Sequence, residues 1–343
     1  MKKIVQLHRK MAPELIDVLE ERYNILQHIQ YAQPVGRRAL ATTLNMGERI
    51  VRAQVDFLKN SGLVDFSPLG MTVTREGQEI LLEMAEYIRL LHDVTSLEEE
   101  LAAKLRLKRV IIIPGDSDVD SAVQRELGRA AAALLRQFLS NNMIIAVSGG
   151  STMARVAEAV TMHAPGTMVV PARGGLGEQV EHQANTIASV MASKLGGRYR
   201  LLHIPDGVSE EALKVITASD ANVRELAQII RRPDILMYGI GQAAEMAIRR
   251  GVDNSIITQM IRSGAVGESL GQYCTMEGKI VYATSSLGLH LNDLAGIRVA
   301  IAVAGGRKKA EAIVAVSGAG RGGESILVTD EGAAKAIHAI INH

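Results

Sequence analysis

Cysteine, tryptophan and aromatic residues in general are scarce in this sequence. Its 343 residues include one cysteine and no tryptophan, and aromatic side chains make up 3% of the total. A single cysteine, Cys274, cannot form a disulfide within the chain, which is typical of a reducing cytoplasm. No nucleophile motif surrounds Cys274, so we expect a small buried apolar residue rather than a reactive thiol. With 47% hydrophobic residues, the chain has ample material for a largely aliphatic core.

Long apolar runs and metal-binding patterns are missing as well. No stretch of about eighteen uncharged apolar residues occurs, so no membrane span is expected. The basic N-terminus lacks the apolar segment of a signal peptide. Both absences predict a cytoplasmic protein without a membrane partner. The nine histidines show no metal-ligand spacing, so we expect no metal site.

An excess of positive charge is also missing, since the formal net charge is +1. This value averages over the whole chain, whereas nucleic-acid binding depends on whether cations gather on one face. The first ten residues carry Lys2, Lys3, Arg9 and Lys10 and no acid. They are either a basic arm that contacts DNA or a frayed, solvated terminus.

The first quarter of the chain has the element pattern of a helix-turn-helix. Apolar residues recur at helical spacing over 13–29, and a short helix is predicted over 36–44. Asn45-Met46-Gly47 follows, where Asn and Gly tolerate the left-handed conformations of a tight turn. A third helix is predicted over 48–60. Two short helices joined by this turn, with the small Ala41 at their crossing, match helix-turn-helix geometry.

A β-hairpin and a longer helix follow. Residues 63–66 and 71–73 predict two short strands about a Ser67-Pro68-Leu69-Gly70 turn. Thr74 is suited to cap a helix that extends to Leu91. Together the elements predict a winged helix-turn-helix, whose third helix enters the major groove.

Four arginines are predicted to bind operator DNA. Arg49 and Arg52 are on the third helix and reach base edges or phosphates, whereas Arg37 and Arg38 begin the second helix and hold the phosphate backbone. Taken singly, each arginine is equally explained as solvated surface charge. The ordered set of helices, turn and hairpin favours DNA binding.

The helix after the hairpin and a second segment over 95–105 form a connector. Leu81, Met84, Ile88 and Leu91 make an apolar stripe on it. The stripe is explained either by burial within its own chain or by pairing with a second subunit. Since operators are usually read by dimers, we expect a homodimer or homotetramer that uses this stripe.

The remainder of the chain alternates strands and helices. Apolar runs predict strands at 110–113, 143–147, 167–170, 200–204, 235–238, 298–303 and 325–328. Buried strands that alternate with helices predict a parallel sheet covered on both faces. The fold class is therefore α/β: an N-terminal winged helix-turn-helix at 1–92 and a larger, Rossmann-like parallel-sheet effector domain at 93–343.

Glycine-rich loops follow four of these strands, at the edge where ligands of such sheets bind. They are Ser148-Gly149-Gly150-Ser151-Thr152, Arg173-Gly174-Gly175-Leu176-Gly177, Gly239-Ile240-Gly241-Gln242-Ala243-Ala244 and Ala304-Gly305-Gly306-Arg307-Lys308-Lys309. Backbone N–H groups and hydroxyls of the first loop suit a phosphate, and the second and fourth supply cations. Each loop alone is explained as a turn that needs glycine. Together they favour an anionic ligand.

The third of these loops spells the dinucleotide fingerprint G-x-G-x-x-A. That motif requires a following strand that ends in an acid about twenty residues on. The next stretch, 254–261, has a helical pattern instead. We therefore expect no nicotinamide cofactor. No Walker A sequence occurs either, which argues against an ATPase.

These motifs resemble those of the SorC family of sugar-responsive bacterial transcription regulators, often grouped with the DeoR type, and most closely its glycolysis-controlling members. The resemblance covers essentially the whole chain. The matching segments are 36–38, 48–58, 148–152, 171–178, 183–186, 239–241, 304–306, 309–313 and 328–331. The most specific of them are the 148–152 loop and Pro171-Ala172-Arg173-Gly174-Gly175.

The resemblance implies an effector domain related in fold to sugar-phosphate isomerases and deaminases. It implies a repressor of a glycolytic operon, with fructose 1,6-bisphosphate as the inducer and with no cofactor. On the matching positions, Gly149, Gly150, Ser151 and Thr152 hold a phosphate. The cations are Arg173, Arg249, Arg250 and Lys309, and Gln183 and Glu268 hydrogen-bond sugar hydroxyls. Two separated phosphates would account for anion sites on several strand ends.

An alternative is a sugar-phosphate isomerase or deaminase that carries a DNA-binding-like segment. Such chemistry needs a carboxylate or histidine over the reacting carbons. Glu268 is the only obvious candidate of the matching set, and no second acid or base accompanies it in the sequence. We therefore expect no catalytic residues and no enzymatic activity.

Overall fold

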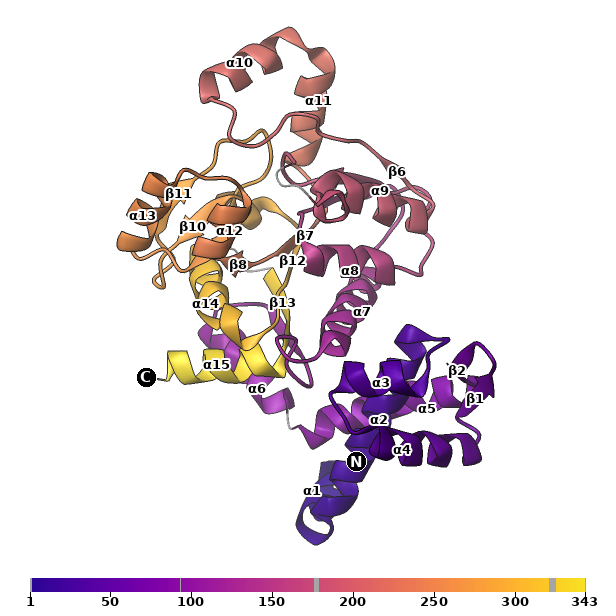
Figure 1. Cartoon of the computed structure of the whole chain (residues 1–343). Coiled ribbons are helices and arrows are strands. Elements are labelled where there is room, and N and C mark those ends of the chain that lie inside the picture. The colour runs from indigo at the N-terminus through magenta and orange to yellow at the C-terminus, as the bar shows by residue number, and fades with distance from the viewer. Residues whose placement is uncertain (1, 93, 176–178, 321–324, 343) are drawn as a thin grey trace. The chain divides into compact units, whose positions relative to one another are not determined.

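The computed structural model describes residues 2–92, 94–175, 179–320 and 325–342 (Figure 1). Contacts divide the chain into two compact units, Met1–Thr95 and Ser96–His343. Each unit has its own hydrophobic core. Among the described residues, no helix has the length and the apolar run needed to cross a membrane.

The first unit is the predicted winged helix-turn-helix, preceded by an additional helix. Its elements are α1 (Lys2–Met11), α2 (Pro13–Ala32), α3 (Arg37–Leu44), α4 (Glu48–Asn60), β1 (Val64–Ser67), β2 (Gly70–Val73) and α5 (Arg75–Leu91). Asn45 takes the left-handed conformation expected of the turn, with φ of 51°. Thr74 caps α5, where its Oγ1 accepts from the Gly77 N–H at 3.0 Å. Because α1 is helical, the terminus is not the frayed segment considered above.

The apolar stripe of the connector is buried inside this unit. Leu81 belongs to the core that α2, α3 and α4 share. Ile88 and Leu91 pack with Val5 of α1, at 5%, 2% and 2% exposure. The expectation that this stripe pairs with a second subunit is therefore wrong. The additional helix α1, which the sequence pattern did not predict, helps to cover it.

The second unit is built on a seven-stranded parallel sheet in the order β3-β13-β12-β7-β4-β5-β6. The strands are β3 (Arg109–Ile113), β4 (Ile144–Val147), β5 (Met168–Pro171), β6 (Arg198–Tyr199), β7 (Ile235–Gly239), β12 (Val299–Val303) and β13 (Ser325–Asp330). The helices around them are α6 (Val94–Lys104), α7 (Ser121–Phe138), α8 (Ser151–Ala159), α9 (Ala184–Leu195), α14 (Ala310–Ala319) and α15 (Glu331–Ile341). The predicted parallel α/β fold is confirmed.

One predicted strand is wrong. Residues 200–204 are not a strand, and the edge strand β6 consists of Arg198 and Tyr199. The Asn185 side chain accounts for this difference. Its amide donates to the Leu202 carbonyl at 3.0 Å and accepts from the Leu202 N–H at 3.0 Å. A side chain thus satisfies the backbone groups that a neighbouring strand would otherwise bind.

A smaller antiparallel sheet and three helices were not predicted. The sheet has the order β11-β10-β9-β8. Its strands are β8 (Gly241–Gln242), β9 (Gly267–Ser269), β10 (Gln272–Cys274) and β11 (Ile280–Ala283). The helices are α10 (Glu210–Ser219), α11 (Ala221–Ile230) and α12 (Ala243–Arg249). In contrast, the helical pattern at 254–261 is confirmed as α13 (Asn254–Arg262). The α10–α11 hairpin projects from the body of this unit (Figure 1).

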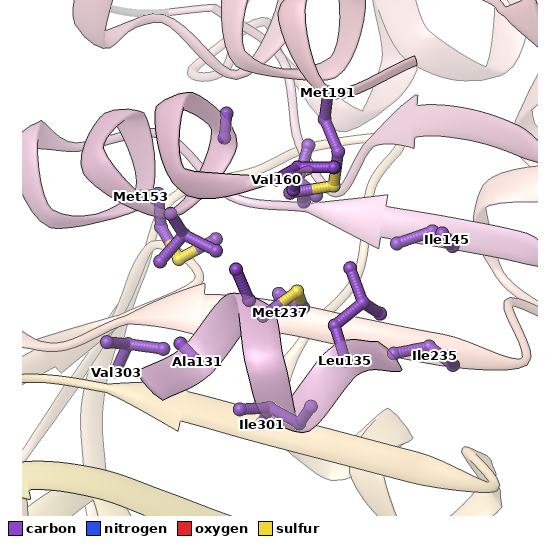
Figure 2. Packing of buried hydrophobic residues seen from close by; sticks show 14 of the residues in the cluster. Ala131, Leu135, Ile145, Met153, Val160, Met191, Ile235, Met237, Ile301 and Val303 are labelled. Carbon is purple, nitrogen blue, oxygen red and sulfur yellow. The ribbon is translucent and has the colours of Figure 1, made fainter. Parts of the chain in front are cut away.

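The main core lies between the parallel sheet and helices α7, α8 and α9. Figure 2 shows Ala131 and Leu135 of α7 over the strands that carry Met237 and Ile301. The buried side chains of this core are all aliphatic or methionine, in line with the scarcity of aromatic residues. Close packing of this core fixes the positions at which the strands end.

The strand order reverses between β4 and β7. From β4 the chain continues outward to β5 and β6, whereas from β7 it continues in the opposite direction to β12 and β13. Ligands of open α/β sheets bind in the crevice beyond the carboxyl ends of the strands at such a switch point. The first and third glycine-rich loops follow these two strands.

Candidate ligand site and nucleic-acid interface

Hydrogen bonds join the chain segments that follow β4 and β7. Ser148 Oγ accepts from the Gly239 N–H at 3.0 Å. Ser269 of β9 donates through Oγ to the Gly239 carbonyl at 2.8 Å, which brings the small antiparallel sheet to the same point. Residues from both sheets thus meet beyond the carboxyl ends of β4 and β7.

Helix α8 begins at this point, directly after β4. Its N-cap, Gly150, has φ of 116° and supplies no side-chain cap, so the first N–H groups of α8 have no partner within the helix. The Gly150 N–H donates to the His182 carbonyl at 2.8 Å. A Cβ at Gly149 would lie 2.8 Å from the same carbonyl oxygen, so glycine permits this close approach. Ser151 and the buried Thr152 form the first turn.

Gln183 joins this group from the start of α9. A Cβ at Gly175 would lie 3.6 Å from Gln183 Oε1, and one at Gly149 would lie 3.9 Å from the Gln183 carbonyl carbon. The structure therefore brings together the 148–152 loop, Gln183 and the first part of the 173–177 loop. Leu176, Gly177 and Glu178 of the predicted motifs lie outside the described residues.

Lys309 follows β12, which lies on the opposite side of β7 from β4. Burial is the main cause that lowers its pKa, although Glu245 and Asp118 act in the opposite direction. Arg249 is near enough to Lys309 for its charge to act on the lysine. Arg249 itself pairs with Glu245 at 2.6 Å. An anion that approaches this partly buried ammonium group would stabilise its charged form.

Arg173, Asp206, Arg250 and Glu268 form a buried chain of alternating charge. Arg173 Nε donates to Asp206 Oδ2 at 2.7 Å, and Arg250 lies 3.6 Å from the same oxygen. Arg250 pairs with Glu268 Oε1 at 3.1 Å. Burial opposes the charge of Arg250, but Glu268, Tyr273 and Asp206 outweigh it and raise the pKa.

Arg173 is engaged by the protein itself. Besides its bond to Asp206, its guanidinium donates to the Leu270 carbonyl and, at 2.9 Å, to the Thr284 carbonyl. Its side chain is 4% exposed. In this structure Arg173 therefore positions the glycine-rich segment after β5, since the adjacent Gly174 N–H also donates to Asp206 at 3.1 Å.

Sequence reasoning missed two acids of this region. Asp206, which holds both buried arginines, stands in a Pro-Asp-Gly stretch that has the pattern of an ordinary turn. Glu245 is near Lys309 only through the fold. Neither belongs to a recognisable motif, although the burial of Arg173 and Arg250 requires a carboxylate partner.

The four arginines predicted to bind DNA divide into two groups. Arg37 pairs with Asp56 of α4 at 2.8 Å, and its guanidinium lies 4.5 Å from the ring centre of Phe66 in the wing. Arg37 thereby connects α3, α4 and β1. Arg38 is 88% exposed and lies 3.4 Å from Glu48.

Arg49 and Arg52 are exposed on α4. Within the described part of the chain, neither has an ion-pair partner. The opposite face of the helix, with Val51, Val55 and Leu58, is buried in the core of the first unit. An exposed pair of cations on the third helix of a winged helix-turn-helix suits the phosphates and base edges of a major groove.

Comparisons with known proteins agree with both units. Residues 18–88 match the family model described as "CggR N-terminal DNA binding domain", and residues 90–339 match "Putative sugar-binding domain". The chain is 40% identical over 338 residues to the central glycolytic genes regulator of Priestia megaterium, with 98% of each chain covered. The chain belongs to the family of central glycolytic genes regulators. Its Bacillus subtilis member is 41% identical over 337 residues, again with 98% of each chain covered.

Solved structures place the chain within the SorC type, as the sequence predicted. A SorC family transcriptional regulator from Enterococcus faecalis is 36% identical and has a TM-score of 0.65, covering 71% of this chain and 99% of its own. The full-length sorbitol operon regulator SorC from Klebsiella pneumoniae shares the fold at 18% identity, with a TM-score of 0.63 over 94% of this chain and 98% of its own. The chain is a transcriptional regulator with a DNA-binding and a sugar-binding domain.

Proposed function

We propose that this regulator represses glycolytic genes and that fructose 1,6-bisphosphate, bound at the switch point, is its inducer. One observation carries the choice of a bisphosphate. The uncapped start of α8 follows β4, the partly buried Lys309 follows β12, and β7 alone separates these two strands. Neighbouring strands are about 4.8 Å apart, so the two anion sites are separated by roughly 10 Å. A sugar with a phosphate at each end spans such a distance.

The residues between the two anion sites suit the sugar. Glu268 pairs in the ladder with Gly241, just after β7, and Gln183 lies beside Gly149 on the other side. In this proposal Gln183 and Glu268 hydrogen-bond hydroxyls, and Arg250 orients Glu268 through their ion pair. Since Arg250 and a backbone N–H already hold Glu268 Oε1, the arrangement serves recognition better than proton transfer.

Regulation requires that the ligand favours one state of the protein over another. We propose that bound bisphosphate favours a state of a homodimer or homotetramer whose recognition helices no longer match the operator half-sites. A coupling free energy of about 1–3 kcal/mol gives a 5- to 150-fold change in operator affinity. Sedimentation and operator-binding measurements, each with and without ligand, test this part of the proposal.

Calorimetric titration tests the ligand. Fructose 1,6-bisphosphate should bind more tightly than fructose 1-phosphate or fructose 6-phosphate by about tenfold or more, because a charged hydrogen bond contributes about 1.5–3 kcal/mol. Lys309→Met should remove most of this difference. Lys308→Met is the matched control, because Lys308 is exposed and adjacent in sequence. Equal affinity for the bisphosphate and both monophosphates would overturn the assignment.

A further inference from the structure

A separate cavity lies between the α10–α11 hairpin and the 283–290 segment. Its volume is about 710 Å³, which is within the range of small-molecule sites, about 300–1,000 Å³. None of the residues assigned above to the sugar-phosphate site lines it. The cavity therefore needs an explanation that the proposed effector does not supply.

Buried apolar side chains form part of the wall of the cavity. Leu213 of α10, Ala227 of α11 and Leu287 are 6%, 5% and 6% exposed and all line it. Thr217 and Ala218 of α10 also line the cavity. Their carbonyls accept from the Arg224 guanidinium at 3.0 and 2.8 Å. Arg224 is thus occupied in holding the two helices of the hairpin together.

The rim of the cavity is positively charged. Lys214 and Arg231 are exposed side chains at its edge, and Glu210 is the acid among its lining residues. Within the described residues, neither Lys214 nor Arg231 has an ion-pair partner. His290 also lines the cavity, and burial together with the charge of Arg173 lowers its pKa, so its imidazole is neutral near pH 7. Together with Arg224, the lining carries more positive than negative charge.

A buried hydroxyl lines the same space. Thr284 is 8% exposed, and its Oγ1 has no hydrogen-bond partner among the described residues. Buried polar groups in native proteins are nearly always satisfied by protein, water or a ligand. Thr284 also uses its carbonyl to accept from Arg173 at 2.9 Å, so the wall of the cavity is part of the segment that holds Arg173 in place.

We propose that this cavity is a second ligand site, which binds a small amphiphilic organic anion with an apolar body and one acidic group. The apolar body occupies the space over Leu213, Ala227 and Leu287, and the acidic group faces Lys214 and Arg231 at the rim. The proposal concerns different residues from the sugar-phosphate site and does not depend on the identity of the inducer.

A fluorescent anion with this chemistry, 8-anilinonaphthalene-1-sulfonate, provides the test on the full-length protein. We expect one molecule bound per chain, with a rise in its emission, and no displacement by saturating fructose 1,6-bisphosphate. Lys214→Ala/Arg231→Ala should weaken binding by tenfold or more. Ala218→Trp, which fills the space from an exposed position and keeps both cations, should abolish it.

The control variant is Arg136→Ala/Lys194→Ala, which removes two exposed cations of the same unit that do not line the cavity. It should bind the dye like the unsubstituted protein. Because partly unfolded proteins also bind this dye, each variant must keep an unchanged melting temperature. Displacement by the bisphosphate, or equal binding by the two double variants, would overturn the proposal.

Discussion

Arg173 and Asp206 form an ion pair in which both side chains are buried, at 4% and 0% exposure, with Arg173 Nε 2.7 Å from Asp206 Oδ2. Asp206 also accepts from the Gly174 N–H at 3.1 Å and lies 3.6 Å from Arg250. One carboxylate therefore faces two guanidinium groups, of which Arg250 also pairs with Glu268 at 3.1 Å. Removal of either partner of such a pair leaves a charge without compensation in a region of low dielectric constant.

We predict that Asp206→Asn lowers the free energy of unfolding by about 3–5 kcal/mol, measured by urea denaturation. The matched control is Glu225→Gln, whose partner Arg200 lies 3.0 Å away and whose side chain is 62% exposed. An exposed pair contributes about 0–1 kcal/mol, so this control should differ little from the unsubstituted protein. If both variants lose a similar free energy of unfolding, burial of the ion pairs of Asp206 does not account for its contribution to stability.

The lowered pKa of Lys309 predicts how stability depends on pH. Between its lowered folded-state pKa and its ordinary value of 10.5, the unfolded chain binds more protons at this residue than the folded chain does. The free energy of unfolding therefore rises with pH across this interval. Lys309→Met lacks this contribution. The free energy of unfolding of the unsubstituted protein should therefore increase relative to that of the variant as the pH rises toward 10.5. If the free energies of unfolding of the two proteins change equally with pH, the lowered pKa of Lys309 is contradicted.

The same pKa predicts proton uptake when an anion binds. A phosphate beside Lys309 favours the ammonium form and raises its pKa. At alkaline pH, where phosphate is already fully ionised, binding of fructose 1,6-bisphosphate should take up protons. Calorimetry in buffers of different ionisation enthalpy measures this number, and Lys309→Met should remove the uptake. An uptake that persists in the variant would assign the proton to another group.

The arginines of the first unit should separate into structural and DNA-binding residues. Arg37→Ala should destabilise the winged helix-turn-helix by about 1 kcal/mol, because it removes a half-exposed ion pair and a cation–π contact. Arg49→Ala and Arg52→Ala should leave the melting temperature unchanged and each reduce the salt dependence of binding to a mixed-sequence duplex by about one unit of slope. Fluorescence anisotropy at several salt concentrations measures the slope. If the salt dependence of binding is unchanged in both variants, Arg49 and Arg52 of α4 do not contact DNA.

Cys274 should be unreactive in the folded protein. It is fully buried, and burial with the nearby charge of Glu268 raises the pKa of its thiol to about 12. Since the thiolate is the reactive form, a disulfide reagent such as dithionitrobenzoate should modify it only after unfolding in guanidinium chloride. Rapid modification of the native protein would contradict this burial.

Residue patterns determined both domain types, because each depends on local rules. Helical spacing, the left-handed Asn45 and the cap at Thr74 specify the winged helix-turn-helix, and apolar runs followed by glycine specify the strands of the parallel sheet. The same patterns located the loops after β4, β5, β7 and β12 that carry the proposed sugar-phosphate site. The rule that parallel strands present their carboxyl ends at one edge then placed these loops together.

Local patterns failed where a distant residue decides the outcome. The Asn185 amide replaces a strand partner at Leu202, and the helix α1 covers the stripe that had been assigned to a second subunit. Neither contact leaves a signal in the spacing of nearby residues.

Sequence by itself therefore determined the two domain types and the residue types at the site. Only the tertiary structure decided the role of each charge. It made Arg173 and Arg37 partners of Asp206 and Asp56, left Arg49 and Arg52 exposed, and placed Lys309 among Glu245 and Asp118. The physical reason is that the free energy of a charge depends on its burial and on partners far away in the chain, which the fold brings within a few ångströms.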